Sequence, residues 1–301
     1  MSGEHVPASQ EGAGLGERNR DQYASGQLAR AFESRGRWLD LGEQAAVTLV
    51  AASSRGRPIL DIGVGAGRTT SLLRLLSDDY VGVDYSHALI ERARLAHPGV
   101  DLRWADARDL SELSDRHFAL VMFSFNGLDS VEHDDRAVVQ RQVRDVLAAG
   151  GHFVYSTLNR RGPYFNELPW HYERDPSESG RLRWWVRLIA SIVIGRGDVR
   201  RRWSTWWRFR PAVRDHGDWG IAPLFGPGSG LLVHWTTPGA TVRELQQAGL
   251  EPVAFFDGDG RPLAPDEDTT SGWFHVVARR PVEAANEGWS AAAGPPADRE
   301  H

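Results

Sequence analysis

The chain of 301 residues contains no cysteine, which excludes disulfide bonds, thiolate metal sites and a cysteine nucleophile. It also contains no lysine, so Schiff-base catalysis by a lysine is excluded. The longest apolar runs, such as Val186 to Ile194, are far too short to cross a bilayer. The first 20 residues are polar and Gly-rich, unlike a secretory signal peptide. We therefore expect a cytoplasmic protein with no stable membrane association.

The overall composition is that of an ordinary globular protein. Hydrophobic residues make up 41% and charged residues 25%, and the chain is long enough to bury a full core. The formal net charge is −5, which argues against a dedicated nucleic-acid binder. We accordingly expect no nucleic-acid partner.

Changes in composition and in hydrophobic periodicity divide the chain into six parts. Both ends are rich in polar residues, Gly, Ala or Pro and are expected to be disordered. The predicted parts are a tail at 1–20, a helical segment at 21–56, an α/β core at 57–159, an Arg/Trp-rich insertion at 160–235, the C-terminal part of the core at 236–281 and a tail at 282–301.

Within the core, short apolar runs alternate with amphipathic patterns of helical period. The runs predict strands at 58–62, 80–83, 100–105, 118–123, 152–156, 252–256 and 273–278. The patterns predict helices at 68–76, from Ser86 to Pro98, from Asp134 or Asp135 to Gly150-Gly151, and at 238–248. Five strands separated by helices indicate a parallel sheet covered on both faces, whereas the last two strands should pair antiparallel.

A Gly-rich turn follows the first predicted strand, in Leu60-Asp61-Ile62-Gly63-Val64-Gly65-Ala66-Gly67-Arg68. Its G-x-G-x-G spacing differs from the G-x-G-x-x-G of dinucleotide sites, and an acid two residues earlier would repel a pyrophosphate. Asp84 and Asp106 end the second and third predicted strands. Because the carboxyl ends of parallel strands share one edge, the acids predict a ligand site there, with Asp84 placed to hold a ribose.

These motifs resemble those of class I S-adenosylmethionine (SAM)-dependent methyltransferases. The turn matches the first family motif, Asp84 the second, Asp106 the third, and Phe123 to Gly127 the segment after strand four. The resemblance covers about residues 23–158 and 238–279. It implies an α/β three-layer sandwich with a mainly parallel seven-stranded sheet, in the order 3-2-1-4-5-7-6 with strand 7 antiparallel. A generic Rossmann-like domain whose acids only cap helices is the alternative.

The resemblance also implies SAM as the cofactor and a role for each matching residue. The glycines would lie under the methionine moiety, Asp84 would hold the ribose, and Asp106 or Ala107 would meet the adenine amine. Tyr23 would contact the methionine carboxylate. The complete expected set is Tyr23, Asp61, Gly63, Gly65, Gly67, Asp84, Tyr85, Asp106, Ala107 and Phe123.

Methyl transfer to a hydroxyl group also needs a base. The catalytic candidates are Asn126, as a hydrogen-bonding group, and His133, His171 and His234, as bases. Each histidine has a simpler interpretation: His133 can merely begin a helix, and a lone histidine is more often packed or solvated. Asp129, His133, Asp134 and Asp135 imitate a metal-binding set, but a helix start explains them too, so no metal is expected.

The insertion holds eight of the chain's 12 tryptophans, and its arginines far outnumber its acids. Its position after the fifth strand predicts a lid over the methyl-transfer site, which can also contribute to a homodimer. Binding of single-stranded nucleic acid, a membrane-surface helix and a dimer interface alone are alternatives. We expect methylation at O or N, or at C, of an aromatic or sugar-bearing small molecule of natural-product type. RNA or protein methylation and a non-catalytic SAM-binding protein are the other candidate functions.

Overall fold

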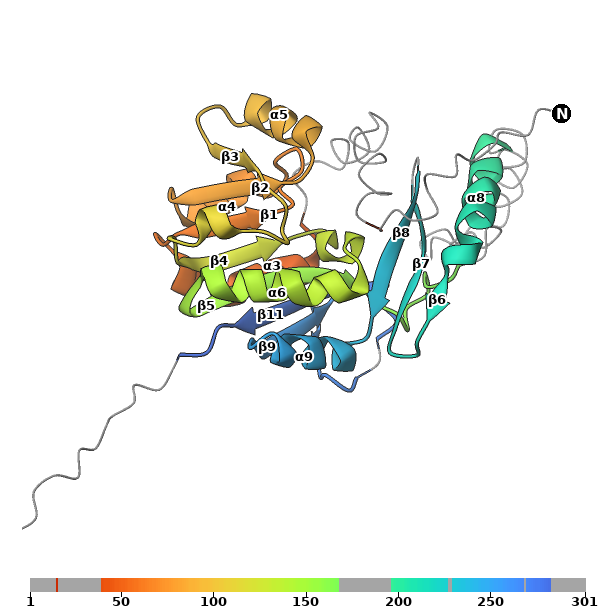
Figure 1. Cartoon of the computed structure of the whole chain (residues 1–301). Coiled ribbons are helices and arrows are strands. Elements are labelled where there is room, and N and C mark those ends of the chain that lie inside the picture. Colours follow the sequence, from red (N-terminus) through yellow and green to blue (C-terminus); the bar gives the residue numbers. More distant parts are fainter. Residues whose placement is uncertain (1–14, 16–38, 168–195, 227–228, 268, 283–301) are drawn as a thin grey trace, which may run out of the picture.

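The computed structural model describes residue 15 and residues 39–167, 196–226, 229–267 and 269–282 (Figure 1). Tyr23, His171, nearly all of both predicted tails and the middle of the insertion lie outside these ranges, so predictions for them stay predictions. Within these ranges, no helix combines the length and apolar character that crossing a membrane requires.

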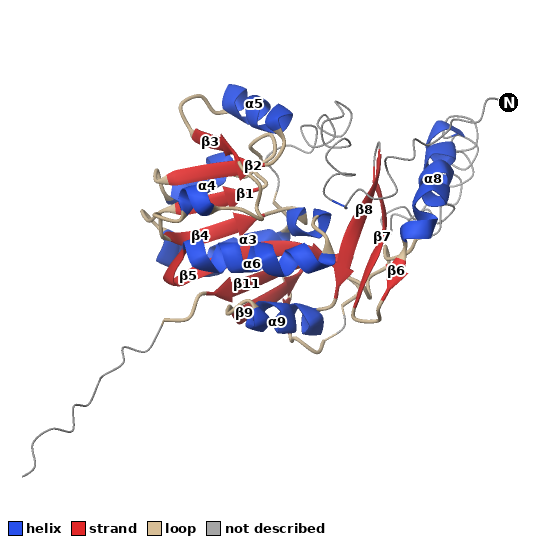
Figure 2. Cartoon of the chain, viewed as in Figure 1, coloured by secondary structure: helices blue, strands red, loops and turns tan. Residues whose placement is uncertain are grey.

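A mainly parallel sheet forms the centre of the fold, in the order β10-β9-β11-β5-β4-β1-β2-β3 (Figure 2). Its strands are β1 (Ile59–Ile62), β2 (Tyr80–Asp84), β3 (Asp101–Trp104), β4 (Phe118–Phe123), β5 (Leu147–Leu158), β9 (Glu251–Asp257), β10 (Pro262–Leu263) and β11 (Trp273–Arg279). β11 lies antiparallel between β5 and β9. The predicted order of seven strands is confirmed. The prediction missed β10, because a two-residue strand has no detectable period.

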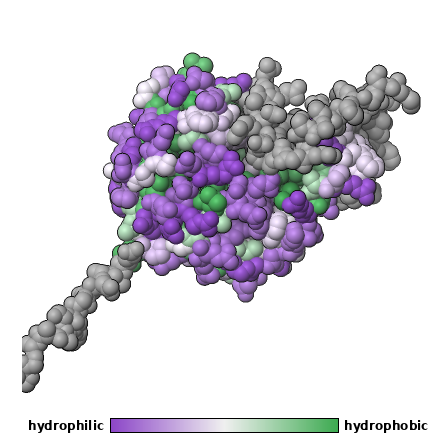
Figure 3. Space-filling model, viewed as in Figure 1, coloured by the Kyte–Doolittle hydropathy of each residue, from purple (hydrophilic) through white to green (hydrophobic). Residues whose placement is uncertain are grey.

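Helices cover both faces of this sheet, as predicted for a three-layer sandwich (Figure 1). One face packs on α3 (Leu41–Ser54), α4 (Thr70–Leu76) and α5 (His87–Ala96), and the other on α6 (His133–Val146) and α9 (Pro238–Gln247). Strand side chains alternate between these two cores: Ile59 joins the first and Leu60 the second. In the view of Figure 3 the surface of this domain is mostly hydrophilic, with small separate hydrophobic areas.

Two predicted boundaries around α6 are wrong. The helix begins at His133 with Glu132 at the N-cap, rather than at an Asp134 or Asp135 cap. It ends at Val146, and β5 starts at the next residue. The Gly150-Gly151 pair therefore lies inside β5, where Gly150 has a φ of 73° and the pairing with β4 shifts register. The glycines permit an irregular strand instead of ending the helix.

The insertion contains a second, antiparallel sheet that the sequence did not predict. It consists of β6 (Arg214–Asp215), β7 (Trp219–Gly226) and β8 (Ser229–Thr236), and α8 (Arg196–Phe209) precedes it. One face packs through Trp235 on Leu158 at the end of β5, and the other packs through Leu232 on Phe209 of α8. The described part of β8 is buried on both faces, so it lacks the alternation that reveals a half-exposed strand.

Candidate functional site

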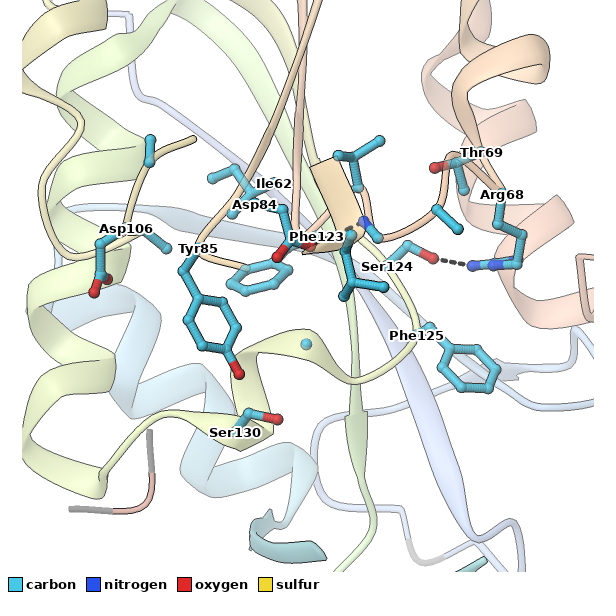
Figure 4. A pocket seen from close by; sticks show the side chains of 18 of the residues that line it. Ile62, Arg68, Thr69, Asp84, Tyr85, Asp106, Phe123, Ser124, Phe125 and Ser130 are labelled. Atoms are coloured by element: carbon cyan, nitrogen blue, oxygen red, sulfur yellow. Dashed lines mark hydrogen bonds between the residues drawn. The ribbon is translucent and has the colours of Figure 1, made fainter. Parts of the chain in front are cut away.

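A cavity of about 350 Å³ lies where β1, β2, β3 and β4 end, the edge that the three acids predicted (Figure 4). Its wall combines the Gly-rich turn, the loops after these strands and the residues around the start of α6. The lining residues are 62–69, 84, 85, 89, 96, 97, 105–108, 123–125, 127, 130–132 and 135.

The backbone of the Gly-rich turn needs glycine at three positions, because Gly63, Gly65 and Gly67 have φ values of 66°, 58° and 91°. A Cβ atom at Gly63 would lie 2.7 Å from the Phe123 ring, so that glycine also makes room for the aromatic wall. Gly65 has no such neighbour, and a ligand can approach its bare backbone. The turn thus combines a tight bend with an accessible main chain.

Asp84 ends β2 at the wall of the cavity, as predicted. Its Oδ2 accepts from the backbone N–H of Gly65 at 2.9 Å, and its Oδ1 accepts from that of Ser86 at 2.8 Å. Burial raises the pKa of Asp84 to about 6, against the effect of these two donors. The carboxylate is therefore fixed in orientation beside the glycine turn.

Asp61 lies behind the turn and does not line the cavity. Its Oδ2 accepts from the Thr69 hydroxyl at 2.6 Å and from the Tyr80 hydroxyl at 2.8 Å. The side chain is fully buried, and burial raises its pKa to about 6. In this position Asp61 fastens the end of the turn to β2, while its expected contact with a cofactor remains a prediction.

The third acid, Asp106, lines the cavity together with Ala107 and Arg108. Arg108 binds Asp106 at 2.7 Å and reaches across to Asp135 of α6 at 3.0 Å. This ion-pair bridge joins the loop after β3 to the start of α6 at the wall of the cavity. The lining residue Tyr85 points toward Ser130 (Figure 4).

A buried polar cluster on the opposite side of the cavity was missed by sequence reasoning. Arg68 makes two hydrogen bonds to the Glu43 carboxylate, at 2.8 and 2.9 Å, and it also donates to Ser124 (Figure 4). The Ser124 hydroxyl in turn donates to Glu43. Arg68 follows the glycine motif directly, but Glu43 lies on α3 with no motif around it. Only the fold therefore brings this pair together.

The loop after β4 adopts a conformation that is unusual for residues with side chains. Phe125 and Asn126 have φ values of 54° and 57°, in the left-handed region. The Asn126 N–H donates to the Ser156 hydroxyl at 2.7 Å, and its buried Oδ1 has no hydrogen-bond partner among the described residues. Phe125 lines the cavity and Asn126 does not. Consecutive strained residues of this kind are frequent at functional loops.

Two of the predicted bases come together outside the cavity. Nδ1 of His133, at the start of α6, lies 3.0 Å from Nε2 of His234 in β8. Trp219 stacks on the His133 ring with centroids 3.6 Å apart. Burial lowers the pKa of both histidines, most strongly that of His234. Neither residue lines the cavity, so their expected role in proton removal stays a prediction.

The chemistry of the cavity wall fits the cofactor that the resemblance implies. The buried Asp84 carboxylate offers acceptors for ribose hydroxyls, and Asp106 offers them for an amine. Apolar side chains, including Ile62, Leu89 and Phe123, supply a wall for a planar ring. The open face of Gly65 leaves room for the backbone to contact a ligand.

Comparison with known proteins agrees with this site. Residues 59–151 match a family model described as a methyltransferase domain. A probable SAM-dependent methyltransferase of Mycolicibacterium smegmatis is 31% identical over 106 residues. That match covers 35% of this chain and 39% of the relative, so the chain spans well under half of the relative's length.

Two solved structures share the fold. The CcbJ methyltransferase from Streptomyces caelestis has a TM-score of 0.54 and 21% identity, over 89% of this chain and 98% of that one. A SAM-dependent methyltransferase from Clostridium acetobutylicum has a TM-score of 0.56 and 12% identity, over 88% and 99%. The sheet order, the motifs around the cavity and these matches agree: residues 59–151 match a methyltransferase domain, the fold is that of class I SAM-dependent methyltransferases, and the cofactor is SAM.

Proposed function

We propose that this protein transfers the methyl group of SAM to an oxygen or nitrogen atom, or to a carbon atom, of a small molecule. The observation that carries SAM-dependent transfer is the cavity, whose volume of about 350 Å³ lies in the range of small-molecule sites. The aromatic rings beside it favour a small acceptor. In the reaction, an electron pair of the acceptor, a lone pair on oxygen or nitrogen or a π pair on carbon, forms the new bond to the methyl carbon. The carbon–sulfur bond breaks at the same time and leaves S-adenosylhomocysteine (SAH), and the proton that the acceptor loses passes to a base or to water.

The cofactor contacts proposed for this domain follow the cavity wall. Asp84 holds the ribose hydroxyls, Asp106 or Ala107 meets the adenine amine, and the glycine turn lies against the methionine moiety. Tyr85 and Phe123 pack against the cofactor, and Tyr23 contacts its carboxylate. Asp61 acts from behind the turn, by holding Thr69 in place.

The acceptor is proposed to bind between the cavity and the second sheet, which β8 joins to the core beside the end of β5. Aromatic rings collect on that side: His216 stacks on Trp219 at 4.0 Å, and Trp219 stacks on His133. Such rings favour a planar or sugar-bearing acceptor of natural-product type. The insertion is proposed as the lid that excludes water, with a homodimer as a further proposal.

Transfer of labelled methyl groups from SAM into a metabolite extract tests this function directly. We expect label in a low-molecular-weight product, in step with SAH release, and much less label with the Asp84→Ala variant at limiting SAM. Matched reactions with total RNA and with denatured protein in place of the extract separate the alternatives. Label only in RNA, lost steeply with added salt, would replace the small-molecule proposal. Tight SAH binding with no label in any arm would favour a non-catalytic SAM-binding protein.

A further inference from the structure

Three side chains that could hold a metal ion meet between the core and the second sheet. His133 is the first residue of α6, His234 lies in β8 and Glu244 lies in α9 (Figure 1). One ligand atom from each lies within 4.8 Å of the other two, and the two imidazole nitrogens are 3.0 Å apart. Of the four residues that the sequence suggested as an imitation of a metal-binding set, only His133 belongs to this one, because folding brings His234 and Glu244 beside it.

The separations suit a first-row transition ion. Bonds of about 2.0–2.1 Å place two ligands of a tetrahedral zinc ion about 3.3 Å apart. The two nitrogens already have nearly that separation, and the carboxylate would move inward by no more than about 1.5 Å. Imidazole and carboxylate ligands without a thiolate are the donors typical of zinc and of non-heme iron sites.

The surroundings hold these ligands in place, as the outer shell of a metal site does. Arg136 donates to Oε2 of Glu244 at 3.2 and 3.3 Å, and Gln140 donates to the same oxygen at 3.4 Å. Oε1 accepts no hydrogen bond among the described residues, so it remains for an ion. The near-parallel stack with Trp219, at an interplanar angle of 4°, fixes the His133 ring.

The charges of the buried groups around Glu244 favour an added cation. Arg136 is almost completely buried and lies between two carboxyl groups, Asp129 at 2.9 Å and Glu244 at 3.2 Å. One guanidinium therefore faces two carboxyl groups in a region of low dielectric constant. A divalent ion beside Glu244 would compensate the excess negative charge.

From this arrangement we infer that His133, His234 and Glu244 form a binding site for a divalent transition-metal ion such as Zn²⁺, which joins the second sheet to the core. The ion would connect β8 and α9, which follow one another along the chain, with α6, which lies far earlier in the sequence. Three protein ligands leave at least one coordination position open. The inference does not depend on methyl transfer, because none of its residues lines the cofactor cavity.

Calorimetry with Zn²⁺ alone tests the site, using the full chain without a polyhistidine tag after treatment with a chelator. We expect one ion per chain and an unfolding temperature that falls with the chelator and recovers with Zn²⁺. His133→Asn and Glu244→Gln should each weaken binding more than the ten- to hundredfold typical of losing an outer-shell partner. His216→Asn is the matched control: His216 stacks on Trp219 but lies outside the set, so this variant should bind as the unchanged chain does.

Absence of stoichiometric Zn²⁺ uptake by the unchanged chain would overturn the inference, and the two histidines would then form only a hydrogen-bonded pair. Equal loss of affinity in His216→Asn would also overturn it, because the ion would then bind at the surface. SAH binding by each variant checks that the fold is intact and should remain unchanged. A failure of the proposed function, seen as no transfer to any acceptor, would leave these metal measurements unaffected.

Discussion

Asp84 is the residue on which the proposed cofactor contacts depend most, since it offers a buried carboxylate at the cavity wall. Replacing it by alanine removes charge-assisted hydrogen bonds to a ribose. We expect Asp84→Ala to weaken SAH binding by about 1.5–3 kcal/mol, measured by titration calorimetry. Asp109→Ala is the control, because Asp109 is exposed on the loop after β3 and does not line the cavity. Equal losses in both variants would contradict a specific role for Asp84.

The same carboxyl group predicts how SAH binding depends on pH. Burial raises the pKa of Asp84 to about 6 in the protein without ligand. Ribose hydroxyls donate to the ionised form, so binding favours loss of the proton, and affinity should fall as the pH drops below about 6. Because one proton is involved, the affinity for SAH can change by no more than about tenfold per pH unit. Calorimetry between pH 7.5 and 5 measures it, and Asp84→Asn should remove this dependence. A flat profile in the unchanged chain would count against the contact.

Comparing Gly63 with Gly56 distinguishes two reasons why a position requires glycine: a left-handed backbone and a lack of space for a Cβ. Their φ values are nearly equal, 66° and 67°, but a Cβ at Gly56 meets nothing within 4 Å, whereas one at Gly63 meets Phe123. Gly56→Ala should cost only the left-handed strain, about 1–2 kcal/mol in the free energy of unfolding. Gly63→Ala should cost about 1–3 kcal/mol more from overpacking and should also weaken SAH binding. Denaturant unfolding and calorimetry measure both, and equal effects would refute the role of the ring.

Among the elements, the turn η3 (Gly127–Ser130) and the helix α6 are joined by a buried ion pair. Asp129 and Arg136 are 2.9 Å apart with essentially no solvent exposure. Asp129→Ala removes this buried ion pair and leaves the Thr157 hydroxyl and the Leu158 N–H without their acceptor. It should therefore lower the free energy of unfolding by about 3–5 kcal/mol. Asp145→Ala removes an exposed pair with Arg144 and should cost no more than about 1 kcal/mol. Similar values from urea unfolding would show that Asp129 contributes little to stability.

Elements that carry their own periodic signal could be predicted from the sequence, and the others could not. The strand that ends at Asp84 and the glycine turn have local patterns, so their places in the sheet and the cavity were predictable. The pairings of Glu43 with Arg68 and of His133 with His234 join residues 25 and 101 positions apart, and only the packing of helices and sheets creates them. The second sheet was missed because the described part of β8 is buried on both faces.

At the scale of the whole molecule, we expect the core alone to bind the cofactor, whereas methyl transfer should also require the insertion. Deleting residues 174–215 removes α8 and β6 but leaves β7 and β8, which pack on the end of β5. We expect the shortened chain to bind SAH yet to lose most methyl transfer, because water is no longer excluded. Calorimetry and the labelled-methyl assay measure the two properties, and an unfolding curve checks the core. Near-native turnover would show that the deleted segment is not a lid.

The position of β11 has a consequence for how the chain is made. This strand is the last of the sheet along the sequence, yet it lies between β5 and β9. While the chain is still on the ribosome, β5 cannot meet this neighbour until Arg279 has left the exit tunnel. The unpaired edge of β5 is then open to other nascent chains, as exposed strand edges are. Completion of the domain must therefore wait until synthesis has passed Arg279, which makes chaperone protection during synthesis valuable for this protein.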